Sequence, residues 1–164
     1  IPFDFYKDKP TPKSMIGQSQ KTTYTHLDGE AVGRHQGAHF FTIGQRKGLA
    51  VGGTPEPLFV IDTDVDENIV YVGQGKEHPG LHRKALKVVS DEIHWVRNDL
   101  KIPLGVKLEV KARIRYRQPL QKATLIKQKE ALYVVFEQPQ SAITSGQFVA
   151  WYQNEELVGS GVIS

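Results

Sequence analysis

The fold of this chain is decided by Val106-Lys-Leu-Glu-Val-Lys-Ala-Arg-Ile-Arg-Tyr-Arg117. An apolar side chain or Tyr occupies every even position of this stretch, whereas Lys, Glu or Arg occupies every odd position. Because successive side chains of a β-strand point to opposite faces, the alternation predicts one continuous strand with one buried and one solvated face. On this pattern Tyr116 points inward, and Arg113, Arg115 and Arg117 point outward.

Shorter stretches of strand composition flank this one on both sides. They lie at residues 86–89, 122–127, 132–137, 147–153 and 157–163. Turns separate them, and the sequence between them shows no convincing helical pattern. About six short strands of this kind predict a small antiparallel β-barrel domain over residues 83–164, and the chain as a whole is predicted to be mainly β.

The first half of the chain has a looser pattern. Residues 1–21 are rich in Pro, Lys, Ser and Gln, and we expect an extended linker or the cut end of a longer protein. Residues 22–82 are expected to form a small mixed, β-rich central domain, in which residues 37–43 suit either a short helix or a strand. Two hairpins are predicted inside this domain, one from residues 22–27 and 30–32 around Asp28-Gly29, and the other from residues 58–62 and 69–73.

Composition and charge narrow the possible classes of protein. Apolar residues make up 39% and charged residues 24% of the chain, which suits a packed globular fold. No run approaches the roughly 18–20 apolar residues of a membrane span. The absence of cysteine excludes disulfides, thiolate zinc sites and cysteine nucleophiles within the chain. Residues 84–164 carry twelve Lys and Arg against eight Asp and Glu, whereas residues 1–83 carry nine against ten, so the second half is the better candidate for a polyanion surface.

Arg113, Arg115 and Arg117 place three positive charges on the solvated face of the 106–117 stretch. Alternate residues of a strand lie roughly 6.5–7 Å apart, close to the spacing of phosphates along a nucleic-acid strand. The three side chains therefore suit contact with a polyanion. The alternative is an ordinary solvated outer face, which antiparallel sheets normally have.

A second cationic feature lies in the run Phe40-Phe-Thr-Ile-Gly-Gln-Arg-Lys-Gly-Leu49, where Arg46 and Lys47 stand between Gly44 and Gly48. Glycine has no Cβ, so the backbone there can adopt positive φ and let another molecule approach closely. A short cationic tip of this kind suits a phosphate backbone. The alternative is a surface loop whose charges are simply solvated.

Metal and catalytic sites find little support. His35 and His39 are four residues apart, as are His78 and His82, but His78 opens a Pro-Gly turn and no thiolate completes a zinc set, so we expect ordinary histidines. The acidic turn 64–68 is similar to the start of a calcium loop but lacks the later ligands. Spacing suggests neither a catalytic triad nor a carboxylate pair, and no glycine-rich phosphate loop precedes a helix.

Six short motifs carry a family resemblance. They are Gly33-Arg-His35-Gln-Gly37, Thr42-Ile-Gly-Gln-Arg-Lys-Gly-Leu49, Gly73-Gln-Gly-Lys-Glu-His-Pro79, His94-Trp95, Arg115-Tyr116-Arg117-Gln118 and Ser145-Gly-Gln147. In order and spacing they resemble the central and C-terminal regions of the bacterial tRNA-specific 2-thiouridylases. The resemblance covers about residues 22–163.

The resemblance implies a cytoplasmic transferase that modifies tRNA by replacing O2 of the wobble uridine with sulfur. In that family an N-terminal PP-loop ATPase domain adenylates the uridine with ATP and Mg²⁺, and two cysteines relay a persulfide. The family's Ser-Gly-Gly-x-Asp-Ser loop and both cysteines are missing here, so we expect no cofactor and no catalytic residue in these 164 residues. The implied partners are tRNA near its anticodon, the protein's own ATPase domain and a sulfur-donor protein, with no membrane.

The resemblance also implies particular RNA contacts. The Arg-Tyr of the family's motif falls on Arg115 and Tyr116, and the Gln of a Pro-Gly-Gln motif falls on Gln147, with Ser145 in place of the proline. Charge and position add the rest. The expected tRNA-binding residues are Arg115, Tyr116, Gln147, Arg117, Arg113, Arg46 and Lys47.

The sequence also allows other roles for these residues and for the chain. Arg46 and Lys47 suit either RNA contact or an interface with the ATPase domain. More broadly, the chain is either a tRNA-binding portion or a structural and docking module with little RNA affinity. A third, weaker alternative is a free-standing RNA-binding barrel.

Overall fold

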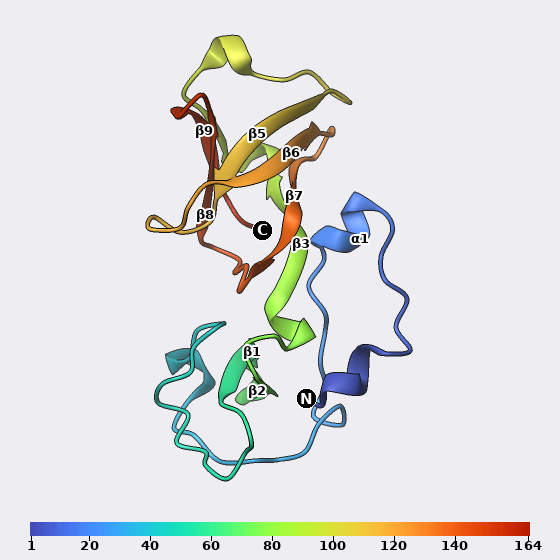
Figure 1. Ribbon diagram of the computed structural model, residues 1–164, viewed down its shortest axis with the longest axis vertical. Helices are drawn as coiled ribbons and strands as arrows, with labels where there is room; N and C mark the ends of the chain where they lie inside the picture. Colours follow the sequence, from blue (N-terminus) through green and yellow to red (C-terminus); the bar gives the residue numbers. More distant parts are fainter. The chain divides into compact units, whose positions relative to one another are not determined.

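The computed structural model describes residues 1–164, and these divide into two units (Figure 1). Unit 1 comprises residues 1–11 and 22–82, and unit 2 comprises residues 12–21 and 83–164. The predicted mainly β fold is confirmed, since strands dominate and the longest helix has five residues. None of the helices is long and apolar enough to cross a membrane.

Unit 2 is built on one antiparallel sheet of seven strands in the order β3-β7-β6-β5-β8-β9-β4. The strands are β3 (His82–Val89), β4 (Ile93–Trp95), β5 (Lys107–Arg113), β6 (Gln121–Lys127), β7 (Ala131–Ser141), β8 (Phe148–Gln153) and β9 (Glu156–Val162). The sequence predicts all of them except β4, which is too short to show a period of its own and forms by pairing with β9.

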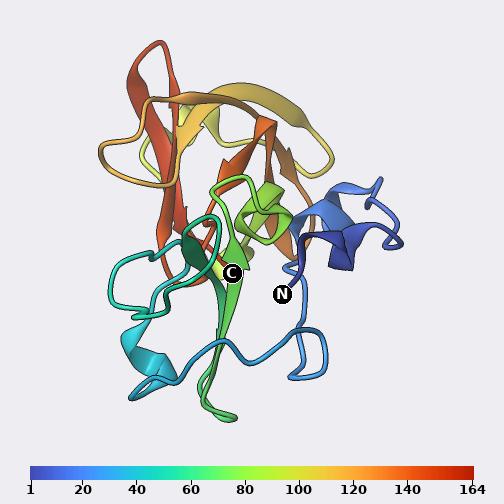
Figure 2. The same ribbon diagram turned by 60° about the horizontal axis from the view of Figure 1, so that its bottom comes forward.

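The sheet of unit 2 curls strongly, as the strands from β5 to β9 show in Figures 1 and 2. The second residue after β9 reaches back to the other end of the sheet, because the Ser164 N–H donates to the Lys87 carbonyl of β3 at 2.9 Å. Gly161 of β9 also faces Val88 of β3 so closely that an added Cβ would overlap its side chain. The result is a half-barrel with its apolar faces turned inward.

The core of unit 2 centres on Trp151, which is completely buried on β8. Its ring packs edge-to-face on Trp95 with 5.5 Å between centroids. Gly159 pairs with Trp151 across β8 and β9, and a Cβ at Gly159 would lie 2.6 Å from the indole ring. Glycine is therefore required opposite this indole. The most buried part of this core also contains Leu86, Val88, Ala112, Leu125, Leu132, Val134, Phe136, Val149, Val158 and Ile163.

Strand β5 is shorter than its alternation predicts. It ends at Arg113, and the chain then turns through residues 114–118. The Gln118 side chain holds this turn, because its Oε1 accepts the Ile114 N–H at 3.0 Å and its Nε2 donates to Oε1 of buried Gln140 at 2.7 Å. The prediction that Tyr116 points inward is wrong, since 85% of Tyr116 is exposed.

Part of the stretch expected as a linker packs on unit 2. Helix α1 (Met15–Ser19) is capped by Ser14, whose hydroxyl accepts the Gly17 N–H at 3.1 Å. Arg83 Nη1 donates to the Ser19 carbonyl at 2.9 Å, and α1 lies beside β7 (Figure 1).

Unit 1 contains one antiparallel hairpin, of β1 (Leu58–Asp64) and β2 (Ile69–Gln74). This confirms the second of the two predicted hairpins. The first, over residues 22–32, is wrong, because no strand forms there. Instead Asp28 Oδ2 accepts both the Thr25 N–H at 2.6 Å and its hydroxyl at 2.9 Å, which closes a local turn in place of a ladder.

The remaining helical elements are short 3₁₀ turns, and the ambiguous stretch 37–43 contains one of them. They are η1 (Phe3–Tyr6), η2 (Ala38–Phe40), η3 (Pro79–Leu81), η4 (Ser90–Glu92) and η5 (Asn98–Leu100).

His78 is buried in unit 1 with both ring nitrogens hydrogen-bonded. Its Nδ1 accepts the Gly80 N–H at 3.2 Å, so Nε2 carries the proton and donates to the Ile1 carbonyl at 3.0 Å. The ring lies against Gly73, where a Cβ would meet it at 2.5 Å. Tyr24, Ile61, Tyr71 and Leu81 form the apolar cluster of this unit.

Acidification is expected to destabilise unit 1 through His78. Burial lowers the pKa of this imidazole below its ordinary value, so the unfolded chain takes up the proton first as the pH falls. The stability contributed by neutral His78 is complete above about pH 6.5 and is lost below it. Thermal unfolding from pH 8 to pH 5 measures this loss. His78→Gln should flatten the pH dependence, whereas His94→Gln, at an exposed position, should retain it. Equal pH dependence in wild type and His78→Gln would contradict this assignment.

Gln118→Ala is expected to destabilise unit 2 by about 1–3 kcal/mol, because it leaves the Ile114 N–H and the buried Gln140 Oε1 without their partner. Urea unfolding measures the change. Gln118→Glu keeps the acceptor but loses the donor, and should fall between alanine and wild type. Gln128→Ala, at an exposed position, is the matched control and should stay within about 0.5 kcal/mol of wild type. A similar effect of both alanine variants would contradict the role of Gln118.

Candidate nucleic-acid interface

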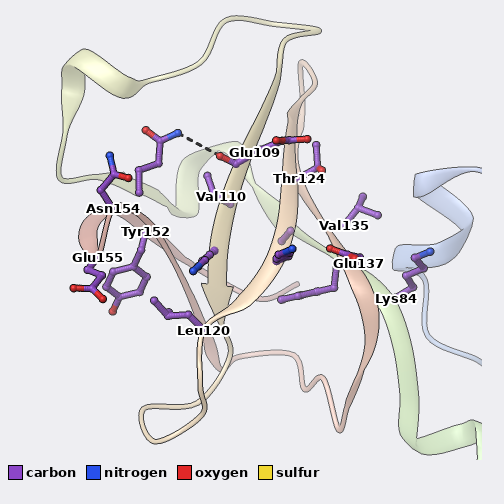
Figure 3. A pocket seen from close by; sticks show the side chains of 15 residues that line it. Lys84, Glu109, Val110, Leu120, Thr124, Val135, Glu137, Tyr152, Asn154 and Glu155 are labelled. Atoms are coloured by element: carbon purple, nitrogen blue, oxygen red, sulfur yellow. Dashed lines mark hydrogen bonds between the residues drawn. The ribbon is translucent and has the colours of Figure 1, made fainter.

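Two hollows of unit 2 differ in the charges that line them. The larger, of about 1060 Å³, lies over β5, β6 and β7 (Figure 3). We call it the mixed hollow, because its charged lining consists of Lys84, Lys111, Lys122, Glu109, Glu137 and Glu155. Equal numbers of positive and negative side chains give this hollow no net attraction for a polyanion.

The second hollow, of about 600 Å³, has cations and no carboxylate in its lining. We call it the arginine hollow. Arg113 and Arg115 line it together with Tyr116, Gln147, Phe148 and Tyr152. The structure thus brings four of the seven predicted residues to one place, since Arg113, Arg115, Tyr116 and Gln147 all border it. A hollow with only positive charge suits an anionic ligand.

Strand β8 forms one side of the arginine hollow. Val149 and Trp151 are buried, so Phe148, Ala150 and Tyr152 face the other way and all three line the hollow. The small side chain of Ala150 lies between two aromatic residues of the same strand face. Because Ala150 pairs with Arg113 of β5, the arginine lies directly across from it.

The Arg113 side chain is held between two aromatic rings. Its Nη2 donates to the Tyr152 hydroxyl at 2.9 Å. Its guanidinium carbon lies 5.1 Å from the centroid of the Tyr152 ring and 5.5 Å from that of Tyr116. These cation–π contacts orient the charge at the hollow.

Arg115 connects the turn after β5 to the chain after β7. Its Nη2 donates to the carbonyls of Ser141 at 2.7 Å and Ala142 at 3.1 Å. Its Nε and Nη1 have no hydrogen-bond partner in the protein. Arg115 therefore has a structural contact and still offers charged donors to a ligand.

Gln147 borders the hollow from the turn that precedes β8. Gly146 has a φ of 87° there, and its N–H donates to the Ile163 carbonyl at 2.8 Å, while the Gln147 carbonyl accepts the Ile163 N–H at 2.7 Å. This backbone pairing holds the turn although Ser145 stands where the resemblance implies a proline. The Gln147 Oε1 is buried and has no hydrogen-bond partner. A buried acceptor without a hydrogen-bond partner is unusual in a folded protein.

Three predicted residues lie outside the arginine hollow. Arg117 is exposed in the turn after β5, and Arg46 and Lys47 are exposed in unit 1. Gly44 and Gly48, which flank Arg46 and Lys47, both have a φ of 86°, which confirms the positive φ expected from the sequence.

The loop that carries Arg46 and Lys47 is held in place by Gln45. The Gln45 Oε1 accepts the Thr42 N–H at 3.1 Å, and its Nε2 donates to the Lys47 carbonyl at 2.8 Å. The Gln45 carbonyl in turn accepts the Val60 N–H of β1 at 2.9 Å. The side chains of Arg46 and Lys47 make no hydrogen bond or ion pair, and both residues are exposed to solvent.

The histidine pairs and the acidic turn have other contacts. No three His, Asp or Glu side chains lie close enough together to hold a metal ion. The ring of His39 packs on Phe40 with 4.1 Å between centroids, and His82 Nε2 lies 3.0 Å from the Lys76 carbonyl. Asp64 Oδ1 accepts the N–H groups of Asp66 and Glu67, so this carboxylate caps its own turn.

Phe148, Ala150 and Tyr152 are members of the arginine hollow that the sequence analysis missed. Their signal was available, because the alternation of β8 places these three residues opposite the apolar Val149 and Trp151. The role of Gln118 leaves no such signal, since a side-chain hydrogen bond that ends a strand does not change the strand's periodicity.

Comparison with known proteins supports the resemblance that the motifs carry. Residues 13–74 match the family described as tRNA methyl transferase PRC-barrel domain, and residues 85–163 match the Aminomethyltransferase beta-barrel domain. These descriptions name domains, whereas the curated relatives share the name of one enzyme.

Three such relatives are each called tRNA-specific 2-thiouridylase MnmA. The protein of Christiangramia forsetii is 65% identical over 93% of this chain and 40% of its own length. The protein of Flavobacterium johnsoniae is 63% identical over 90% of this chain and 37% of its own length, and that of Halalkalibacterium halodurans is 44% identical over 84% and 36%. The chain thus spans two-fifths or less of these relatives. It belongs to the tRNA-specific 2-thiouridylase family and corresponds to the C-terminal part of its members.

Proposed function

We propose that this chain is the tRNA-binding portion of a tRNA 2-thiouridylase, and that the arginine hollow contacts the RNA. The observation that carries the proposal is the lining of this hollow, which contains two arginines, two tyrosines and no carboxylate. The mixed hollow on the same sheet has balanced charge, so net charge favours the arginine hollow for a polyanion.

The residues of the hollow suit phosphate and ribose contacts near the anticodon of the tRNA. Arg115 offers donors from a guanidinium that the Ser141 and Ala142 carbonyls already orient. Arg117 adds an exposed charge next to it, and Gln147 adds an amide at the edge. Contacts of this type position an RNA by its backbone and shape without reading base sequence.

The chemistry of the whole protein lies outside these residues in this proposal. The name of the relatives supports 2-thiolation of uridine in tRNA. In this proposal the modified uridine is the wobble base. The chain has no cysteine, and its longest helix has five residues with no glycine-rich loop before it, so it fits neither persulfide relay nor ATP. ATP and Mg²⁺ would activate the uridine in a PP-loop ATPase domain preceding this chain, with sulfur arriving from a donor protein in the cytoplasm.

A second candidate function is docking. The exposed Arg46 and Lys47, on a loop fixed by the side-chain hydrogen bonds of Gln45, suit an interface with the ATPase domain or the sulfur donor. Gel-shift titration of tRNA with residues 1–164, with and without the rest of the protein, separates the two functions. We expect a shift by residues 1–164 alone. Binding that appears only with the rest of the protein would favour docking.

Substitution of the exposed arginines is expected to weaken tRNA binding and its dependence on salt. In the full-length protein, Arg115→Ala with Arg117→Ala should reduce the slope of log K against log salt by about 1–2, because two phosphate contacts are lost. Lys111→Ala with Lys122→Ala removes the same charge from the mixed hollow and should leave the slope unchanged.

Arg117→Ala alone separates loss of charge from loss of structure. The Arg117 side chain makes no hydrogen bond within the protein, whereas Arg115 donates to two loop carbonyls. Circular dichroism confirms that each variant is folded. A slope that stays at the wild-type value in folded variants would show that these arginines are not phosphate ligands.

A further inference from the structure

Phe148 is an exposed aromatic residue at the border of the arginine hollow. It is 65% exposed at the first position of β8, and Tyr116, which also lines the hollow, is 85% exposed. A single exposed apolar side chain is ordinary on a protein surface. Here, however, the exposed aromatic rings border a hollow whose only charges are two guanidinium groups.

The three aromatic residues of the hollow differ in what covers them. Arg113 lies over the rings of both Tyr152 and Tyr116. Phe148 has neither a ring partner nor a cation over its face. Its neighbours are Ala150 on the same face of β8 and Val162, its pairing partner on β9, and 65% of Phe148 stays exposed beside them. A planar ligand can therefore reach Phe148 without displacing an existing contact.

The chemistry of the hollow distinguishes paired from unpaired RNA. A duplex hides the faces of its bases and presents phosphates and ribose, which need only the arginines. An unpaired nucleotide presents a base face together with its phosphate, and proteins bind such nucleotides by combining aromatic platforms with cations. The arginine hollow contains both aromatic rings and cations, and they lie on neighbouring positions of adjacent strands and the turn after β5.

We propose that Phe148 stacks against an unpaired base of the RNA while Arg113 and Arg115 bind the phosphates beside it. The proposal rests on the proposed RNA-binding function and adds that the hollow takes a single-stranded nucleotide. Tyr116 also borders the hollow. Every side chain in this arrangement is already in place around the hollow.

The test measures tRNA binding by the full-length protein carrying substitutions at Phe148. Phe148→Ala should weaken binding roughly 5- to 100-fold, which corresponds to the loss of one stacked base. The slope of log K against log salt should not change, because no phosphate contact is lost. Phe148→Trp should retain the affinity and Phe148→Leu should not, since only an aromatic face stacks. Leu104→Ala, at a 63% exposed position of the same unit, is the matched control and should have no effect.

A second probe is an RNA duplex with blunt ends and no unpaired base. Phe148→Ala should bind this duplex as the wild type does. Wild-type affinity of Phe148→Ala or Phe148→Leu for tRNA would overturn the stacking proposal, and so would an equal loss of affinity for tRNA and duplex. If the arginine variants weaken binding and Phe148→Ala does not, the RNA-binding function stands without stacking. If neither set has an effect, the RNA-binding function itself fails.

Discussion

The side chain of Gln118 sets the form of the candidate site. By accepting the Ile114 N–H and donating to Gln140, it ends β5 and turns the next residues away from the sheet. Continued alternation would have buried Tyr116 and separated it from Arg115 by the thickness of the sheet. The turn instead exposes both residues at one hollow. A neutral amide that contacts no ligand therefore determines which side chains a ligand meets.

The core beneath β8 gives the hollow a firm base. Trp151 is buried between Trp95 and the strand that carries Gly159, so the packing of its indole holds β8 in position on the core. Phe148, Ala150 and Tyr152 project from the opposite face of the same strand. Because side chains of a strand cannot exchange faces without a shift of register, burial of Trp151 also keeps these three residues at the hollow. The buried face of β8 thus determines which residues its other face presents at the hollow.

Periodicity predicted those parts of the fold that depend on it. Alternation located β5, and strand composition between turns located most other strands of unit 2 and the hairpin of β1 and β2. It failed at Tyr116 and at residues 22–32, where the side chains of Gln118 and Asp28 capture backbone N–H groups that a ladder would otherwise use. The arginines of the site were found from charge. Phe148 and Tyr152 were missed because the stretch was judged by its composition, although the alternation of β8 places both residues opposite the buried Val149 and Trp151.

Arg115 shows a further property of a side chain that is tied at one end. Its Nη2 is fixed by two main-chain carbonyls before any ligand arrives, so its rotamers are already restricted in the free protein. Ordering a long side chain on binding costs about 0.5–1.5 kcal/mol, and here folding has met most of that cost. A lysine at this position would offer its three donors from a single nitrogen, so the carbonyls and a ligand would have to gather around one atom. The guanidinium can thus be held by the protein through Nη2 and still donate hydrogen bonds to a ligand through Nε and Nη1.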